Sequence, residues 1–219
     1  MVITWYGLSC FKITFGELAL VTDPFSKTLG LAAPRFRADI AIISNISNPT
    51  YNNQESLSGD NTFVIDGPGE FDVKGLFVQG IAARGGIKSQ NDGFDYTTIY
   101  AIRMEDIRLG FLGSLKQKEL TDGQLEALGE IDILFIPVGG RLVCDAEEAV
   151  TIVNQIEPHI VIPMHYAQKG LGLELDKVEQ FLKEIGQAKA SPEEKLTIKK
   201  SGFEELKETT KVVVLSPQR

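Results

Sequence analysis

The sequence is poor in the residues that usually hold metals and disulfides, with two cysteines, two histidines and one tryptophan among 219 residues. Cys10 and Cys144 lie far apart, so they offer neither a disulfide framework nor a Cys-x-x-Cys metal pair, and a reducing compartment fits them. No apolar run reaches the roughly 18 residues of a membrane span, and no basic segment opens a secretory signal. We therefore expect a cytoplasmic protein without a membrane partner.

Positive charge is also scarce, because 22 Lys and Arg face 30 Asp and Glu and leave a net charge of -8. Sequence-independent binding to nucleic acid needs clustered Lys and Arg. The longest basic cluster, Lys195 to Lys200, is interrupted by Leu196 and Ile198 in strand-like alternation. This pattern is typical of a solvated strand, and nucleic acid is not an expected partner.

The sequence does contain a regular succession of short strands. Residues 2–6, 10–15 and 18–22 are predicted as three strands, and Phe11, Ile13 and Phe15 alternate with Lys12 and Thr14 at the period of a half-buried antiparallel sheet. Residues 38–43, 131–137 and 159–166 are instead continuous apolar runs, typical of strands buried on both faces. The run at 131–137 repeats the pattern at 38–44, which suggests two related halves. We predict one α/β domain spanning residues 1–219.

Helices are predicted from capping residues and from the spacing of apolar residues. Thr121 with Gln124, and Asp145 with Glu148, form capping-box patterns ahead of apolar residues, so a helix should follow each. A third amphipathic helix is expected over residues 175–185.

The most informative stretch is 42–53, where a buried strand leads into a polar loop rich in turn-forming residues. A loop at the carboxyl end of such a strand is where an open α/β sheet usually places its chemistry. We therefore take this loop as the candidate site.

Here the sequence resembles the metallo-β-lactamase-fold hydrolases, in particular a small single-domain bacterial branch named Zn-dependent hydrolases. The resemblance is carried by Ile-Thr-Trp-Tyr-Gly-Leu-Ser-Cys-Phe-Lys-Ile at 3–13, Thr-Asp-Pro-Phe at 22–25, Asp-Gly-Pro-Gly-Glu-Phe at 66–71 and Ile-Pro-Met-His-Tyr at 162–166. It covers residues 1–185. It implies a four-layer αβ/βα sandwich and, for the family, a site with one or two metal ions.

The ligand positions of that family are degraded here. In the family the first buried strand runs into His-x-His-x-Asp-His, further ligands follow in two later loops, and a last His ends a strand. Only His165, at that last position, is a family ligand. The other positions carry residues that bind metal poorly: Asn45, Ser47, Pro49, Thr50, Gly85 and Ser114.

A functional metal centre needs three or four well-held ligands, so we expect no cofactor and interpret His165 as a relic. One alternative is a rebuilt zinc site, for which the residues at strand ends are the candidates: Asp23, Asp66, Cys144, Asp145 and His165. Another uses no metal. Cys144 precedes a helix N-terminus and His165 ends a neighbouring strand, so they are candidates for a nucleophilic pair.

These observations favour a non-catalytic superfamily member that binds a protein or a small-molecule ligand in the old cleft. The alternative is a metal-dependent hydrolase of esters, lactones or phosphodiesters with an unconventional site. Dimerisation through an edge strand such as 212–215 is also open.

Overall fold

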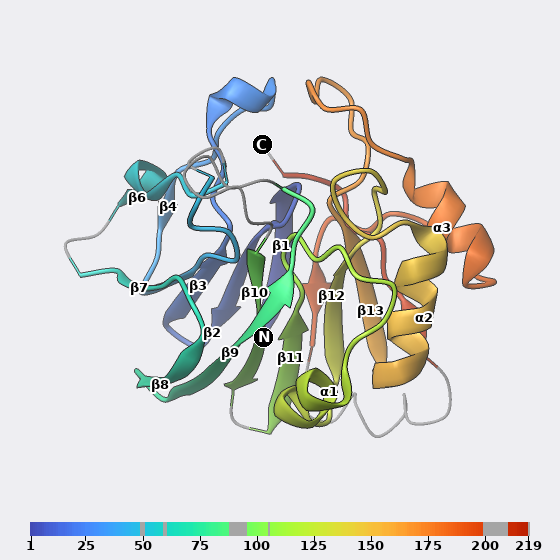
Figure 1. Cartoon of the computed structure of the whole chain (residues 1–219). Coiled ribbons are helices and arrows are strands. Elements are labelled where there is room, and N and C mark those ends of the chain that lie inside the picture. Colours follow the sequence, from blue (N-terminus) through green and yellow to red (C-terminus); the bar gives the residue numbers. More distant parts are fainter. Residues whose placement is uncertain (49–50, 59–60, 88–95, 105, 199–209, 219) are drawn as a thin grey trace.

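The computed structural model of the chain describes residues 1–219 except 49–50, 59–60, 88–95, 105, 199–209 and 219. Its core lies between two mixed β-sheets that face each other (Figure 1). The first sheet has the strand order β14-β1-β2-β3-β5-β7. Its strands are β1 (Val2–Gly7), β2 (Cys10–Phe15), β3 (Leu18–Thr22), β5 (Ile40–Ile42), β7 (Phe63–Ile65) and β14 (Leu196–Thr197).

The second sheet has the order β15-β13-β12-β11-β10-β9-β8. Its strands are β8 (Gly69–Val73), β9 (Leu76–Arg84), β10 (Tyr96–Met104), β11 (Ile107–Phe111), β12 (Ile133–Pro137), β13 (Ile160–Met164) and β15 (Lys211–Val212). Strands β3, β5 and β7 pair in parallel in the first sheet, as β11, β12 and β13 do in the second. The two predicted halves therefore have equivalent parallel strands.

Aromatic side chains join the two sheets. The ring of Phe11 in β2 meets the ring of Phe135 in β12 edge to face, with centroids 4.7 Å apart. Phe11 and Leu20 point into this core, whereas their neighbours Cys10 and Val21 point to the opposite face of the first sheet, as a period of two requires. The first sheet is thus buried on both faces, and its strand ends are held rigidly.

Three α-helices cover the outer face of the second sheet: α1 (Asp122–Leu128), α2 (Ala146–Ile156) and α3 (Val178–Glu184) (Figure 1). Both capping boxes are confirmed, at Thr121 with Gln124 and at Asp145 with Glu148. Helix α3 begins later than the pattern predicted, because Asp176 is held in an extended segment by backbone bonds to Gly139 and Ala167.

The outer face of the first sheet is covered differently. Its covering segment contains two 3₁₀ turns, η1 (Lys27–Leu29) and η2 (Gln54–Ser56), and the short pair β4 (Phe36–Arg37) and β6 (Leu57–Ser58). Leu29, Phe36 and Tyr51 pack from this segment onto the sheet. The predicted α/β class is confirmed, and within the described residues the fourth layer of the sandwich holds no α-helix. None of the helices described is long and apolar enough to cross a membrane.

Candidate functional site

The ends of several strands meet at one buried polar site. Ser44 follows β5, and its carbonyl oxygen accepts a hydrogen bond from the Thr98 backbone of β10 at 2.8 Å. Gly85 forms an isolated bridge with Leu115, the residue after Ser114. His165 follows β13 and donates its backbone N–H to Leu8 at 3.0 Å. The carboxyl ends of strands from both sheets therefore converge, as the loop prediction required.

Asp23 is the centre of a hydrogen-bond network at this site. Ser9 Oγ donates to its carboxylate at 2.8 Å, and Ser44 donates from its backbone N–H at 2.7 Å and from Oγ at 2.6 Å. Burial nevertheless raises the pKa of Asp23 from 3.8 to about 6, against the lowering effect of these bonds. All these donors are groups of the protein itself, so the Asp23 carboxylate links the segments that carry Ser9 and Ser44.

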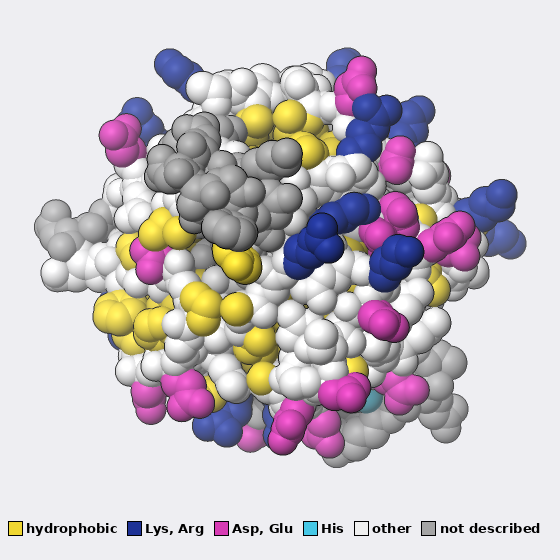
Figure 2. Space-filling model, viewed as in Figure 1, with side chains coloured by type: hydrophobic (Ala, Val, Ile, Leu, Met, Phe, Trp, Pro, Cys, Tyr) yellow, Lys and Arg dark blue, Asp and Glu magenta, His cyan; other side chains and the backbone are white. Residues whose placement is uncertain are grey.

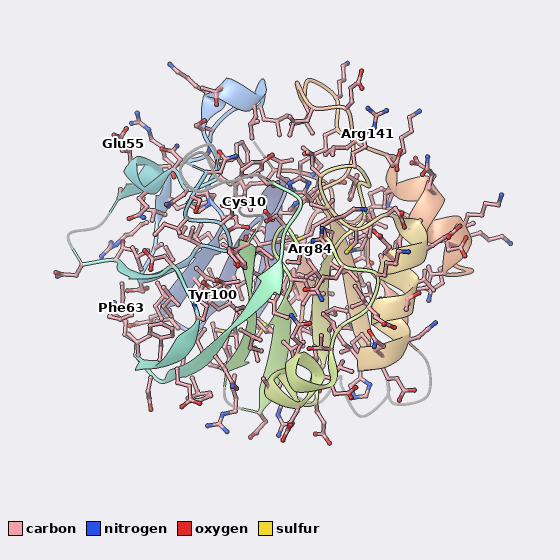
Figure 3. The ribbon with its side chains drawn as sticks, viewed as in Figure 1. Cys10, Glu55, Phe63, Arg84, Tyr100 and Arg141 are labelled. Carbon is pink, nitrogen blue, oxygen red and sulfur yellow. The ribbon has the colours of Figure 1, made fainter. Side chains whose placement is uncertain are left out.

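Figure 3 labels two residues that border this carboxylate, Cys10 of β2 and Tyr100 of β10. The charge of Asp23 contributes to the raised pKa of both side chains, after the larger effect of burial. The Tyr100 hydroxyl donates to the backbone carbonyl of Ile43 at 2.8 Å. Both side chains are thus protonated and structural at neutral pH.

Two residues at the family's ligand positions, Ser114 and Asn45, are hydrogen-bonded to other groups of the protein. Ser114 Oγ lies 3.2 Å from Thr97 Oγ1, which in turn donates to the Ser44 carbonyl at 3.1 Å. Asn45 donates Nδ2 to the Ile87 carbonyl at 3.3 Å, whereas its Oδ1 is enclosed and has no partner in the part of the chain that the structure describes. Ser47 is half-buried, and Pro49 and Thr50 lie outside the described residues.

A very close approach holds the two site loops together. A Cβ added to Gly113 would lie 2.2 Å from the Cβ of Ser44, and Gly113 has a φ of +51°. Only glycine fits this position, because the space is filled and the backbone is left-handed. The loop that carries Ser114 is thereby pressed onto the loop that carries Ser44 and Asn45.

His165 is fully buried, and both of its ring nitrogens are enclosed without a hydrogen-bond partner among the described residues. Burial lowers the pKa of this imidazole from 6.5 to about 4, so the ring is neutral at physiological pH. The ring of Tyr51 stacks on it with centroids 5.6 Å apart and an interplanar angle of 26°. Tyr51 itself is 5% exposed, so it closes the site from the side of the site loop.

The structure does not bring together the residues proposed for a rebuilt site. Asp66 is exposed. Asp145 accepts from the Glu148 backbone at 3.0 Å as the cap of α2. The Cys144 thiol is 3.2 Å from the Leu115 carbonyl and 3.4 Å from the Gln117 carbonyl, and burial raises its pKa to about 12. Within the described part of the chain, no group of three His, Cys, Asp or Glu side chains could hold a metal ion.

The same contacts bear on the proposed nucleophilic pair. A Cys-His pair requires the sulfur and an imidazole nitrogen within hydrogen-bond reach, so that the ring can take the thiol proton and leave a thiolate. The Cys144 thiol instead donates to backbone carbonyls, and neither nitrogen of His165 has a partner among the described residues. Burial outweighs any effect of the α2 N-terminus on the thiol.

Zinc prefers three or four nitrogen, sulfur or carboxylate ligands, each oriented by a further hydrogen bond. Here one imidazole and one amide oxygen are enclosed, and the Asp23 carboxylate already accepts from two serines. The donor set therefore does not fit the family's metal centre.

Sequence reasoning missed four residues that build the site: Ser9, Ser44, Tyr51 and Thr97. Ser44 and Tyr51 both lie in the stretch taken as the candidate site, so their positions were within reach. Ser9 and Thr97 carried no signal, because they meet Asp23 and Ser114 only through the fold.

Comparison with known protein families and relatives gives consistent matches over most of this chain. The beta-lactamase superfamily domain matches residues 2–165. A UPF0173 protein of Pyrococcus abyssi is 27% identical over 202 residues, covering 84% of this chain and 90% of the relative. A protein of Methanocaldococcus jannaschii named a UPF0173 metal-dependent hydrolase is 29% identical over 203 residues, covering 83% of this chain and 90% of its own.

Among solved structures, a Thermotoga maritima protein assigned to the Zn-dependent hydrolases of the metallo-beta-lactamase superfamily superposes with a TM-score of 0.76. It is 31% identical, and the match covers 98% of this chain and 97% of that one. A metallo hydrolase of Ignicoccus hospitalis shares the fold, with a TM-score of 0.69 at 16% identity over 100% of this chain and 96% of its own.

Proposed function

Because this chain belongs to the metallo-β-lactamase superfamily, we propose that it keeps the hydrolase scaffold without the hydrolase's metal and uses the scaffold to bind a partner. The observation that carries the proposal is the enclosure of His165. Its neutral ring lies beneath Tyr51, and neither nitrogen is accessible to an ion or to the water that such an ion would activate. A catalytic zinc site needs an open position for that water.

The surface beside the site supports a binding role. Ile46, in the site loop, is 51% exposed, and Tyr96, at the start of β10, is 64% exposed. The two segments are adjacent, because the Thr98 backbone donates to the Ser44 carbonyl. In this proposal the two exposed side chains are contact points for a protein or a small apolar ligand.

The charge of the molecule limits the kind of partner. Figure 2 shows Asp and Glu side chains along the lower edge of one face, and Lys and Arg side chains mostly toward its top and right, with further Asp and Glu side chains among them. Such a face offers no continuous basic surface to a phosphate backbone. A cytoplasmic location, and a partner other than nucleic acid or membrane, are part of this proposal.

A second function is favoured by a specific observation. Buried polar atoms normally have partners, so the enclosed Asn45 Oδ1 and the two His165 nitrogens need an explanation. An unconventional metal ion held by His165, Asn45 and Asp23 would supply it and would keep a metal-dependent hydrolase possible. It would have to displace Ser9 or Ser44 from Asp23 and move Tyr51 away from the imidazole.

Elemental analysis separates the two functions. The protein is purified without chelator or metal-affinity resin and analysed before and after incubation with Zn²⁺, Mn²⁺ and Fe²⁺. We expect no stoichiometric metal and no rise in melting temperature, since an ion at 100 times its dissociation constant would stabilise the fold by about 2.7 kcal/mol. One or two ions per chain, lost in a His165→Gln variant, together with hydrolysis of esters, lactones or phosphodiesters, would establish the metal-dependent function instead.

A further inference from the structure

A second concave site lies next to the buried polar site but uses different residues. It has a volume of about 550 Å³ and is formed by the segment after β13, the start of α3 and the last residues of the chain. Pockets of roughly 300–1,000 Å³ are the size that encloses small organic ligands. Its lining includes Trp5, Tyr166, Lys169, Lys177, Glu179 and Leu215.

The wall of this pocket is aromatic and preformed. The rings of Trp5 and Tyr166 lie 5.0 Å apart at an angle of 41°. Trp5 is held in place because its Nε1 donates to the Leu8 carbonyl at 2.9 Å. Trp5 is 1% exposed and Leu215 is also 1% exposed, so the apolar surface is set back within the fold. These two side chains therefore form the floor of the pocket, over which an apolar body can lie.

One polar group in this wall has no partner. Tyr166 is 6% exposed, and its hydroxyl makes no hydrogen bond to any described residue. Tyr166 lines the pocket, and among the described residues its hydroxyl is not one of the fully enclosed side-chain atoms that lack a partner, so it keeps some exposure. Burial, with a smaller effect of the Glu179 charge, raises the pKa of this phenol well above 10.0. The hydroxyl therefore stays protonated and can donate a hydrogen bond.

The rim of the pocket carries a positive charge in an otherwise acidic molecule. Lys169 and Lys177 are exposed on the rim and form no ion pair with a described acidic residue. Glu179 contributes the one opposing charge among the lining residues. Two lysine ammonium groups and a phenol donor that line one pocket are complementary to a carboxylate, which accepts from both kinds of group.

We propose that this pocket binds a small organic carboxylate with an apolar body, which lies against Trp5 while its carboxylate accepts from Tyr166 and is attracted by Lys169 and Lys177. The site goes beyond the function proposed above. It shares no side chain with the Asp23 network, so it stands or fails independently of any metal.

The chain provides its own reporter, because Trp5 is its only tryptophan. Phenylacetate and octanoate are titrated into the whole protein while tryptophan fluorescence is recorded, with phenylacetamide and octanol as uncharged probes. We expect a saturable change with at least one carboxylate and weaker binding of its uncharged counterpart. No saturable change with either carboxylate, or equal binding of the uncharged probes, would overturn the proposal.

Variants locate the binding. Tyr166→Phe removes the donor and keeps the ring, and Lys177→Gln removes one charge; each should weaken carboxylate binding about threefold to tenfold, the range of one hydrogen bond. The matched control is Lys183→Gln, an exposed lysine on the same helix outside the pocket, which should leave binding unchanged. Equal weakening in Lys183→Gln and Lys177→Gln would show a general effect of net charge and contradict the site.

Discussion

Asp23 and His165 are two buried groups whose titrations act on stability in opposite directions, and single substitutions should separate them. The pKa of Asp23 is raised from 3.8 to about 6 by burial, and that of His165 is lowered from 6.5 to about 4 by burial. Both intervals cover the pH range from about 4 to about 6. In the wild-type protein the two contributions should largely cancel there.

The sign of each contribution follows from which state binds the proton more tightly. Folded Asp23 holds its proton to higher pH than the unfolded chain, so stability is lost as the pH rises from 3.8 to about 6. A rise in the pKa of Asp23 from 3.8 to about 6 corresponds to about 3 kcal/mol of folding free energy. Folded His165 resists protonation, so stability is lost as the pH falls from 6.5 to about 4. This lowering of the His165 pKa also corresponds to about 3 kcal/mol of folding free energy.

Urea unfolding of the wild type, Asp23→Asn and His165→Gln, measured across this pH range, tests the argument. Other titrating groups contribute equally to all three proteins, so differences in slope isolate the two sites. Relative to wild type, stability should rise with pH in Asp23→Asn and fall with pH in His165→Gln, each by up to about 1.4 kcal/mol per pH unit. Slopes that are the same in all three proteins would refute the reasoning.

Three further perturbations have defined outcomes. Tyr51→Ala should cost about 3 kcal/mol in urea unfolding and expose His165 to modification by diethyl pyrocarbonate, to which the native ring should be inert. Both buried cysteines should react with a thiol reagent only after unfolding; fast reaction of the native protein would contradict their protonated, enclosed state. Gly113→Ala should cost about 3 kcal/mol because its Cβ would strike Ser44, whereas Gly16→Ala, with positive φ but open space, should cost about 1 kcal/mol; equal losses would show that backbone strain alone matters.

Much of the fold could be predicted because its signals are local. Alternation in residues 11–15 placed β2, and the turns at Gly7 and Gly16 separated it from β1 and β3. Continuous apolar runs placed β5, β12 and β13, and the two capping boxes placed α1 and α2. The α3 boundary was wrong because its cause is not local: Asp176 is bound to Gly139 and Ala167, which are distant in sequence. That residues 1–219 form one domain stays a prediction.

The site was harder to predict because its contacts join distant segments. The loop after β5 was identified from its position, and His165 from its resemblance to a family ligand. Nothing local indicated that Tyr51 would stack on His165, or that Ser9 and Ser44 would occupy the carboxylate of Asp23. The ring of Tyr51 could be assigned to the site only once the fold placed the imidazole of His165 against it.

In our proposal, His165 is a neutral, enclosed imidazole that does not bind metal. The chain has two histidines, so long-range ¹H–¹⁵N NMR with a His159→Gln reference can assign each ring. His165 should remain neutral from pH 7 down to about pH 4, and its nitrogen shifts should not change on adding equimolar Zn²⁺. A zinc-dependent change in the chemical shift of either His165 ring nitrogen would contradict the account and support the metal-dependent hydrolase function instead.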